Sequence, residues 1–269
     1  MKTKHINLAT YDDFEKLNTF AGNIDAYRTE KLKSAAGHVS FIKKLFPKKK
    51  ITVLELGSGN SKTLFALEKA GVLHKGYGLE ISKSRYEFAQ LWKKEWGFKL
   101  IENRNEDALR ITWSDFLGLN LCFIVDLTLQ FFEAVEKGSS MKILKSVYRS
   151  LERGGKVIIE VDGLGKVLSK MHGKSVRFWE EFAEPDPWRY SLWDCAFDHK
   201  NKMLDIKKVF VKRNEYGISE NRMVLRVYSK VDMQKLLKQA GFSHIAFYAD
   251  WRGGKFKDDK GEYIIVGTK

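Results

Sequence analysis

The chain contains little cysteine and no long apolar run. Cys122 and Cys195 are its only two cysteines, and their distance along the chain gives neither a metal-ligand spacing nor a disulfide framework. Nowhere do about 18 apolar residues follow one another, and Met1 to His5 lead into mixed polar sequence rather than the apolar core of a signal peptide. Internal repeats and low-complexity segments are also missing. We therefore expect a soluble, cytoplasmic, globular protein without a bound metal.

The charge is strongly positive but is spread out. The formal net charge is +14, which raises the question of a polyanionic partner. Lysines occur along the whole chain, however, and the densest run, Lys48 to Lys50, precedes a predicted strand instead of lining a helix face. This distribution favours a solvated surface. It disfavours a nucleic-acid partner, which stays open as an alternative, and it also suits a small anionic substrate.

Residues 23–161 alternate between helical and strand patterns. Apolar residues recur at helical spacing from Asn23 to Phe46, and Pro47 ends that pattern. The run from Ile51 to Leu56 is nearly all apolar, as in a strand buried on both faces of a parallel sheet. Strands alternating with helices predict a doubly wound sheet. The predicted strands are 51–56, 75–80, 98–102, 119–127 and 156–161, and the helices between them are 62–70, 82–96 and 139–151.

The pattern changes after Val161. Segments 191–197, 203–212 and 222–228 alternate apolar and polar residues, which is typical of half-exposed antiparallel strands. Phe178, Trp179 and Phe182 are interpreted as the apolar side of an amphipathic helix. A helix at 230–240 and strands near 244–248 and 263–266 then resume the α/β pattern. The sequence thus predicts an antiparallel β cap inserted after the fifth strand of an α/β core.

A glycine turn with nearby acids marks the candidate site. Gly57 and Gly59 follow the first predicted strand and precede a helix, so the backbone can approach a ligand closely. Glu55 stands two positions before the first glycine. A negative charge there would repel a pyrophosphate but suits a cofactor with an ammonium and a sulfonium. Glu80 ends the second strand, where a doubly wound fold places a carboxylate for ribose hydroxyls.

These motifs resemble those of the class I S-adenosylmethionine (SAM) dependent methyltransferases. That family has a mostly parallel, seven-stranded sheet whose last strand is antiparallel. Its glycine motif matches Glu55, Gly57 and Gly59, while Ser61 replaces the third glycine. The resemblance covers residues 30–161 well and implies SAM as cofactor and S-adenosyl-L-homocysteine as product. It assigns to the cofactor site Glu55, Leu56, Gly57, Ser58, Gly59, Ser61, Glu80, Ile81, Glu106, Asp107, Ala108, Asp126 and Leu127.

The cap resembles the lid of methyltransferases that act on small molecules, including sugars and natural products. We therefore divide the chain into an N-terminal helical segment covering the active site (1–50), a SAM-binding core (51–161), the cap for the acceptor (162–228) and closing helix and strands (229–269). The expected reaction is in-line methyl transfer to an O or N atom of an acceptor that can be anionic. Expected acceptor contacts are Tyr27, Gln130, Trp188, Tyr190, Trp193, Arg226 and Tyr228, with His172 and Asp194 as candidate catalytic residues.

Three alternatives stay open. A tRNA or rRNA methyltransferase would suit the basic charge, but Asp126-Leu127-Thr128-Leu129 stands where base-amino methylating enzymes have an Asn/Asp-Pro-Pro-aromatic tetrad. In a nicotinamide-dependent oxidoreductase, glycine rather than Lys62 would stand three positions after Gly59. A SAM-binding protein without turnover is the third alternative. Monomer and homodimer are equally compatible with the sequence.

Overall fold

The computed structural model describes residues 24–184, 188–213, 217–258 and 261–269. Residues 1–23 of the predicted N-terminal segment lie outside the described part. The central strands, which pair in parallel, are β1 (Ile51–Leu56), β2 (Leu73–Leu79), β3 (Ile101–Arg104), β4 (Leu119–Ile124) and β5 (Leu151–Asp162). The last strand, β11 (Glu262–Thr268), pairs antiparallel with both β5 and β10 (His244–Tyr248). The sheet order is β10-β11-β5-β4-β1-β2-β3.

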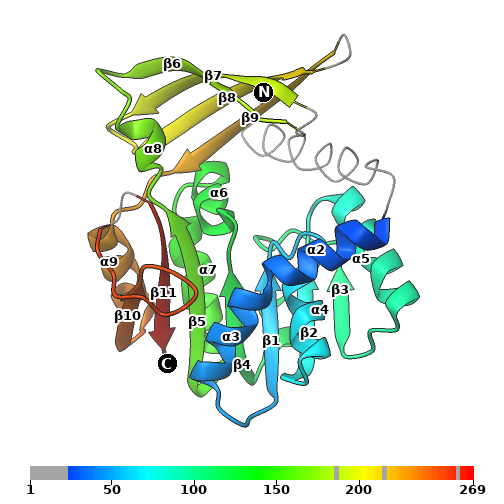
Figure 1. The fold of residues 1–269 in the computed structure, drawn as a ribbon. Coiled ribbons are helices and arrows are strands. Elements are labelled where there is room, and N and C mark those ends of the chain that lie inside the picture. The colour runs from blue at the N-terminus through cyan, green and yellow to red at the C-terminus, as the bar shows by residue number, and fades with distance from the viewer. Residues whose placement is uncertain (1–23, 185–187, 214–216, 259–260) are drawn as a thin grey trace.

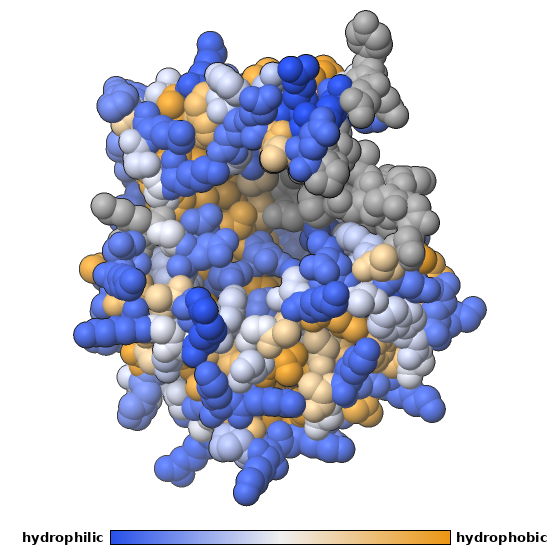
Figure 2. All heavy atoms as spheres, viewed as in Figure 1, coloured by the Kyte–Doolittle hydropathy of each residue, from blue (hydrophilic) through white to orange (hydrophobic). Residues whose placement is uncertain are grey.

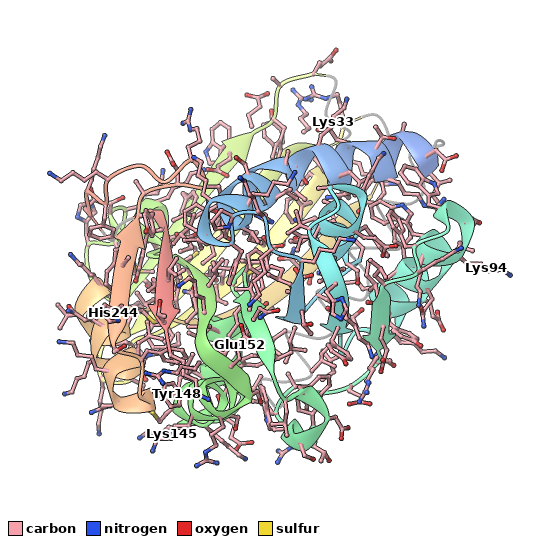
Figure 3. All side chains as sticks on the ribbon, turned by 90° about the horizontal axis from the view of Figure 1, so that it is seen from below. Lys33, Lys94, Lys145, Tyr148, Glu152 and His244 are labelled. Carbon is pink, nitrogen blue, oxygen red and sulfur yellow. The ribbon has the colours of Figure 1, made fainter. Side chains whose placement is uncertain are left out.

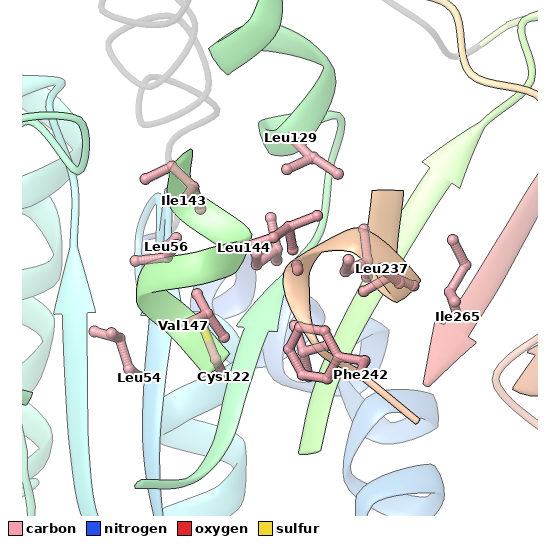
Figure 4. Close-up of a cluster of buried hydrophobic side chains, with 14 of the residues drawn as sticks. Leu54, Leu56, Cys122, Leu129, Ile143, Leu144, Val147, Leu237, Phe242 and Ile265 are labelled. Carbon is pink, nitrogen blue, oxygen red and sulfur yellow. The ribbon is translucent and has the colours of Figure 1, made fainter. Parts of the chain in front are cut away.

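Helices cover both faces of this sheet (Figure 1). One face packs against α2 (Ile24–Ser34), α3 (Ala36–Leu45), α4 (Lys62–Lys69) and α5 (Lys83–Trp96). The other packs against α7 (Ser139–Ser150), α9 (Lys230–Ala240) and the short 3-10 helix η1 (Trp113–Phe116). Side chains alternate along the strands, so Val53 enters the first core and Leu54 the second. Figure 4 shows Leu54 and Cys122 of the sheet beside Val147 of α7.

Local signals explain several helix ends. Ser82 accepts a hydrogen bond from the Arg85 amide and begins α5, and Gly97 ends that helix at a φ of 71°. Ser229 and Asp232 form a capping box at the start of α9, which Gly241 ends. The predicted helix from Asn23 to Phe46 is instead two helices, which meet at Ala35.

A second sheet forms the cap. It consists of β6 (Ser175–Glu181), β7 (Trp188–Asp198), β8 (Met203–Lys212) and β9 (Ile218–Arg226), paired antiparallel in that order. The short α8 (Gly165–Leu168) connects it to β5. The fold class is therefore confirmed: an α/β protein with a mostly parallel seven-stranded sheet and an antiparallel β cap inserted after the fifth strand.

Two local predictions were wrong. The segment with Phe178 and Trp179 is strand β6, not a helix, and Trp179 is 61% exposed. The third strand begins at Ile101 rather than at Phe98. The helix α6 (Thr128–Val135), which follows β4 after a three-residue loop and packs against β9 of the cap, was not predicted.

The lysines lie on different sides of the molecule. Figure 3 shows Lys33, Lys94 and Lys145 projecting outward from three separate regions. No helix in the described ranges has the length and apolar character needed to cross a membrane.

Candidate functional site

A cavity of about 540 Å³ lies between the carboxyl ends of the parallel strands and the cap. Its lining comes from α2 and α6, from the loops after β1, β2, β3 and β4, from the ends of β5 and β11, and from β8 and β9 of the cap. Figure 2 shows the surface hollowed between the cap and the core. The volume is in the usual range for small-molecule sites, and parallel α/β sheets bind ligands at this end.

The glycine loop after β1 forms one wall. Gly57 and Gly59 both have positive φ angles, 66° and 55°. A Cβ atom at Gly57 would lie 2.6 Å from the Thr128 hydroxyl oxygen, so only glycine lets this loop approach α6 so closely. Ser61 also has a positive φ, 61°, but its hydroxyl donates to Asn103 Oδ1 at 2.9 Å and it does not line the cavity.

Glu55 is a buried carboxyl group on the cavity wall. It is 3% exposed, and its Oε2 accepts no hydrogen bond from the described residues. Burial raises its pKa from 4.5 to about 8, Lys62 opposes that rise, and Asp126 adds to it. A buried polar atom without a partner is uncommon. This oxygen can therefore accept a hydrogen bond from a ligand.

Glu80 is held in place by backbone amides. Its Oε2 accepts from Gly59 N and its Oε1 from Ser82 N, each at 2.7 Å. Burial raises the pKa of Glu80, while the charge of Arg85 opposes the rise. Because each carboxylate oxygen can accept a second hydrogen bond, Glu80 can still receive two ligand hydroxyls.

The loop after β4 has an unusual backbone. Asp126 and Leu127 are consecutive non-glycine residues with positive φ, 52° and 66°. Two contacts hold Asp126: its backbone N donates to Glu160 Oε2 at 3.1 Å, and Lys62 Nζ lies 3.3 Å from its Oδ2. Left-handed backbone at such residues costs about 1–3 kcal/mol each and is concentrated at functional sites.

Three further carboxyl groups reach the cavity from β5 and β11. Glu160 and Asp162 alternate along β5, and Glu262 of β11 lies directly opposite Asp162. Burial raises the pKa of Glu160 to about 7, and the neighbouring Asp126 charge adds to this. None of the three was predicted, although an acid within the apolar run 157–162 repeats the pattern seen at Glu55.

The cap supplies the opposite wall. Lys208 and Asn221 lie opposite each other on β8 and β9, and Phe210 and Met223 flank them. Lys208 Nζ lies 3.5 Å from the centroid of the Trp193 ring, and burial lowers the pKa of Lys208 to about 8. Asn221 Oδ1 is buried without a hydrogen-bond partner in the described part of the chain.

Comparisons with known proteins identify the fold. No protein-family model matches the chain, and neither does any curated protein sequence. Among solved structures, the CcbJ methyltransferase from Streptomyces caelestis is 16% identical, with a TM-score of 0.73 over 87% of this chain and 88% of that one. A SAM-dependent methyltransferase from Clostridium acetobutylicum ATCC 824 is 15% identical, with a TM-score of 0.70 over 90% and 96%. This chain has the methyltransferase fold.

A third neighbour extends the comparison. An amino pentose methyltransferase from Micromonospora echinaspora, involved in calicheamicin biosynthesis and solved with SAM bound, is 13% identical, with a TM-score of 0.62 over 91% of this chain and 94% of that one. At such identities the likeness concerns the fold, while function has to be argued from the site.

In this methyltransferase fold, most predicted cofactor residues line one cavity. Leu56 and Ser61 do not, because both are fully buried outside its lining. Asp107 lines the cavity, and its Oδ1 also accepts from Leu109 N. The other predicted residues that line it are Glu55, Gly57, Ser58, Gly59, Glu80, Ile81, Glu106, Ala108, Asp126 and Leu127.

The predicted acceptor residues are placed differently. Only Tyr27 lines the cavity. Gln130 is fully buried and hydrogen-bonds to backbone atoms of Asp162 and Arg226, so it connects the two ends of the cap. Tyr228 is buried and donates to Ser140 Oγ at 2.8 Å.

Strand parity explains most of the other differences. Trp193 lies on the inner face of the cap behind Lys208, and Trp188 packs beside the lining residue Phe210. Tyr190 contacts the exposed Trp179 on the outer face. Asp194 lies on that face too and pairs with Arg177. Neighbouring residues of a strand point to opposite faces, so a sequence window alone does not identify the ligand side.

The remaining two candidates also lie outside the cavity lining. Arg226 donates to the carbonyl oxygen of Asn201. His172 is exposed in the turn that precedes β6. Neither is positioned to contact a ligand in the cavity.

Proposed function

We propose that this chain is a SAM-dependent methyltransferase that methylates a nitrogen or oxygen atom of a small molecule. The observation that carries the proposal is the unpartnered carboxylate oxygen of Glu55 beside the glycine loop. A buried carboxyl group there costs stability unless a ligand brings positive charge or donors. SAM carries both, since it has an ammonium group and a sulfonium centre.

The residues present fit this cofactor. Glu80 would accept the ribose hydroxyls, Glu55 would face the positively charged methionine part, and Asp107 and Ala108 would lie along the adenine. When bound, SAM supplies an activated methyl group. The chain's own part is to bind and orient the two reactants and to exclude water, which is the main source of rate for an in-line displacement.

The cap above the cavity supports a small acceptor. The cap covers the strand ends, and its inner face places Lys208, Phe210 and Met223 on the cavity wall. Two structural neighbours are named for activity on sugars, the amino pentose enzyme and a sugar N-methyltransferase from Streptoalloteichus sp ATCC 53650. Methylation of RNA would be recognised by labelled methyl groups entering RNA rather than low-molecular-mass products.

Calorimetry with SAM and S-adenosyl-L-homocysteine tests the cofactor site. Glu80→Gln should weaken binding by about 1–3 kcal/mol, because a charge-assisted hydrogen bond to ribose becomes a neutral one. Glu87→Gln removes the same charge from an exposed position on α5, where Glu87 pairs only with Lys83 3.6 Å away among the described residues, and should bind like the wild type. A wild-type protein that binds neither compound would refute the proposed function.

A further inference from the structure

The cavity is acidic although the protein is basic. Eight carboxyl-bearing residues line it, against four basic ones, while the whole chain has a formal charge of +14. The acids are Glu55, Glu80, Glu106, Asp107, Asp126, Glu160, Asp162 and Glu262, and the bases are Lys31, Lys62, Arg85 and Lys208. Concentrated negative charge in a cleft attracts a positively charged ligand.

SAM does not account for all of these acids. Glu55 and Glu80 lie on the β1 and β2 side of the sheet, which the cofactor would occupy. Glu160, Asp162 and Glu262 lie on β5 and β11, in register on one face of two adjacent strands. The second group therefore faces the part of the cavity left for the acceptor, beneath the cap.

Unpartnered buried oxygens give an independent indication. Glu55, which is 3% exposed, leaves Oε2 without a donor on the cofactor side of the cavity. Across the cavity, on the cap, Asn221 Oδ1 is also buried without a donor among the described residues. The amide oxygen of Asn221 is a hydrogen-bond acceptor, and Glu55 Oε2 is one when its carboxyl group is ionised, so a ligand in the cavity has to supply N–H or O–H groups.

We propose that the acceptor is a basic amine, that its ammonium group binds between Glu160, Asp162 and Glu262, and that Glu160 takes the proton which this ammonium must lose. This inference rests on the proposed function and narrows its acceptor to nitrogen. An anionic acceptor, which the basic charge suggested, would face these three carboxylates, and Arg226, the one arginine among the expected acceptor contacts, lies outside the cavity lining.

Glu160 is oriented for proton transfer. Trp251 Nε1 donates to its Oε1 at 2.9 Å, and Asp126 N donates to its Oε2 at 3.1 Å. Each oxygen keeps a second lone pair. A proton moves from the ammonium nitrogen to a Glu160 oxygen, which frees the nitrogen lone pair. That pair forms the new N–C bond as the C–S bond breaks with its electrons left on sulfur, and solvent takes the proton from Glu160 after product release.

The pH dependence follows from the charges around Glu160. Asp126, Asp162 and Glu262 are the nearby acids, Lys62 pairs with Asp126, and Lys208 faces the cavity from the cap. Burial and the acids raise the pKa of Glu160 to about 7. The reaction needs the ionised form of Glu160, so kcat/KM should rise as the pH increases through about 7. It should fall again at the higher pH at which the substrate ammonium in solution loses its proton.

The first experiment identifies the methylated atom. The full-length protein is incubated with methyl-labelled SAM and a small-molecule cell extract, and labelled products are identified by mass spectrometry. Label on an amine nitrogen supports the inference. Label on oxygen overturns the inference and leaves the proposed function intact. Label on carbon only, or SAM binding without any labelled product, contradicts both the inference and the proposed function.

The second experiment tests Glu160 with the amine found. Glu160→Gln should lower kcat at least about 100-fold and remove the rise of kcat/KM near pH 7, while S-adenosyl-L-homocysteine still binds. Glu87→Gln is the matched control and should retain the wild-type profile. A Glu160→Gln enzyme with an unchanged pH profile would overturn the role of Glu160.

Glu262, the exposed residue among the three carboxylates, provides a second test that a folding defect would not explain. Glu262 lies at the start of β11 and is exposed, so Glu262→Gln should fold normally. It should raise KM for the amine at least about tenfold with little change in kcat, through loss of a charge-assisted hydrogen bond. An unchanged KM would overturn the ammonium site.

Discussion

Glu55 offers a test in which stability and binding change in opposite directions. In the ligand-free protein its carboxyl group is buried, and its pKa is raised from 4.5 to about 8. We expect Glu55→Gln to weaken SAM binding and to make the ligand-free protein more stable at alkaline pH. The reason is that the amide removes the need to bury an ionised group.

The magnitude follows from the linkage between protonation and folding. One pKa unit corresponds to 1.36 kcal/mol, so a difference of about 3.5 units amounts to about 5 kcal/mol. The pKa of Glu55 is higher in the folded than in the unfolded state. Its protonated form therefore contributes this stability to the folded protein in full below pH 4.5. It is lost progressively as the pH rises and is gone above about pH 8. At pH 7 the loss is already about 3 kcal/mol.

The assay is urea unfolding of wild type and Glu55→Gln without ligand from pH 5 to pH 9. His38 also affects acid stability, because burial lowers its pKa to about 4, but it is present in both proteins. The difference between their unfolding free energies should shift by several kcal/mol in favour of the variant as the pH rises. Parallel curves would refute the assignment of Glu55 as a destabilising buried acid.

Binding gives a second readout of the same group. A cationic ligand should return Glu55 to its ionised form, so the wild type should release about one proton on binding SAM at pH 7. Calorimetry in buffers of different ionisation enthalpy measures this release. Glu55→Gln should bind SAM more weakly and release none.

The remaining predictions concern two expected site residues that do not line the cavity. Gln130→Leu should lose the three hydrogen bonds that join Asp162 and Arg226, which costs about 1–3 kcal/mol, and limited proteolysis should then cut within β6–β9 faster than in the core. Gln90→Leu, which removes a single side-chain bond to Tyr86, should leave the cleavage pattern unchanged. His172→Ala should keep kcat/KM within about twofold, because general base catalysis contributes at least 100-fold where it operates; a hundredfold loss would return His172 to the site.

Much of the fold could be predicted because its signals are local. The apolar runs at β1 and β4, the glycine turn and the Ser229 to Gly241 helix are each determined by neighbouring residues. β6 was missed because aromatic residues at positions 178, 179 and 182 fit a helical spacing. In the structure Phe178 and Trp179 lie on opposite faces of β6, with Phe178 stacked on Trp193 inside and Trp179 outside, and Phe182 follows the strand.

The site residues also differ in whether local sequence predicts their positions. Glu55 lies at the end of β1, Gly57 and Gly59 follow it, and Glu80 follows β2, so short sequence windows predict that these residues meet. Glu160 and Glu262 are about 100 residues apart and meet only because β11 inserts beside β5. Lys208 and Asn221 are paired on β8 and β9, and both side chains point toward the cavity because they lie on the inner face of the cap. Such placements depend on tertiary pairing, which periodicity does not encode.

The loop after β4 connects the two halves of the cavity. Asp126 faces the glycine-loop side through Lys62, and its backbone N is held by Glu160 on the proposed acceptor side. The next residue, Leu127, packs against the inner cluster of the cap together with Phe131. Packing of Leu127 can therefore offset the cost of two left-handed residues, and displacement of the cap would weaken that support. The glycine loop, the acids proposed to bind the acceptor and the cap are thus connected through one strained turn, so we expect a change in the cap to affect the proposed cofactor site as well as the proposed acceptor site.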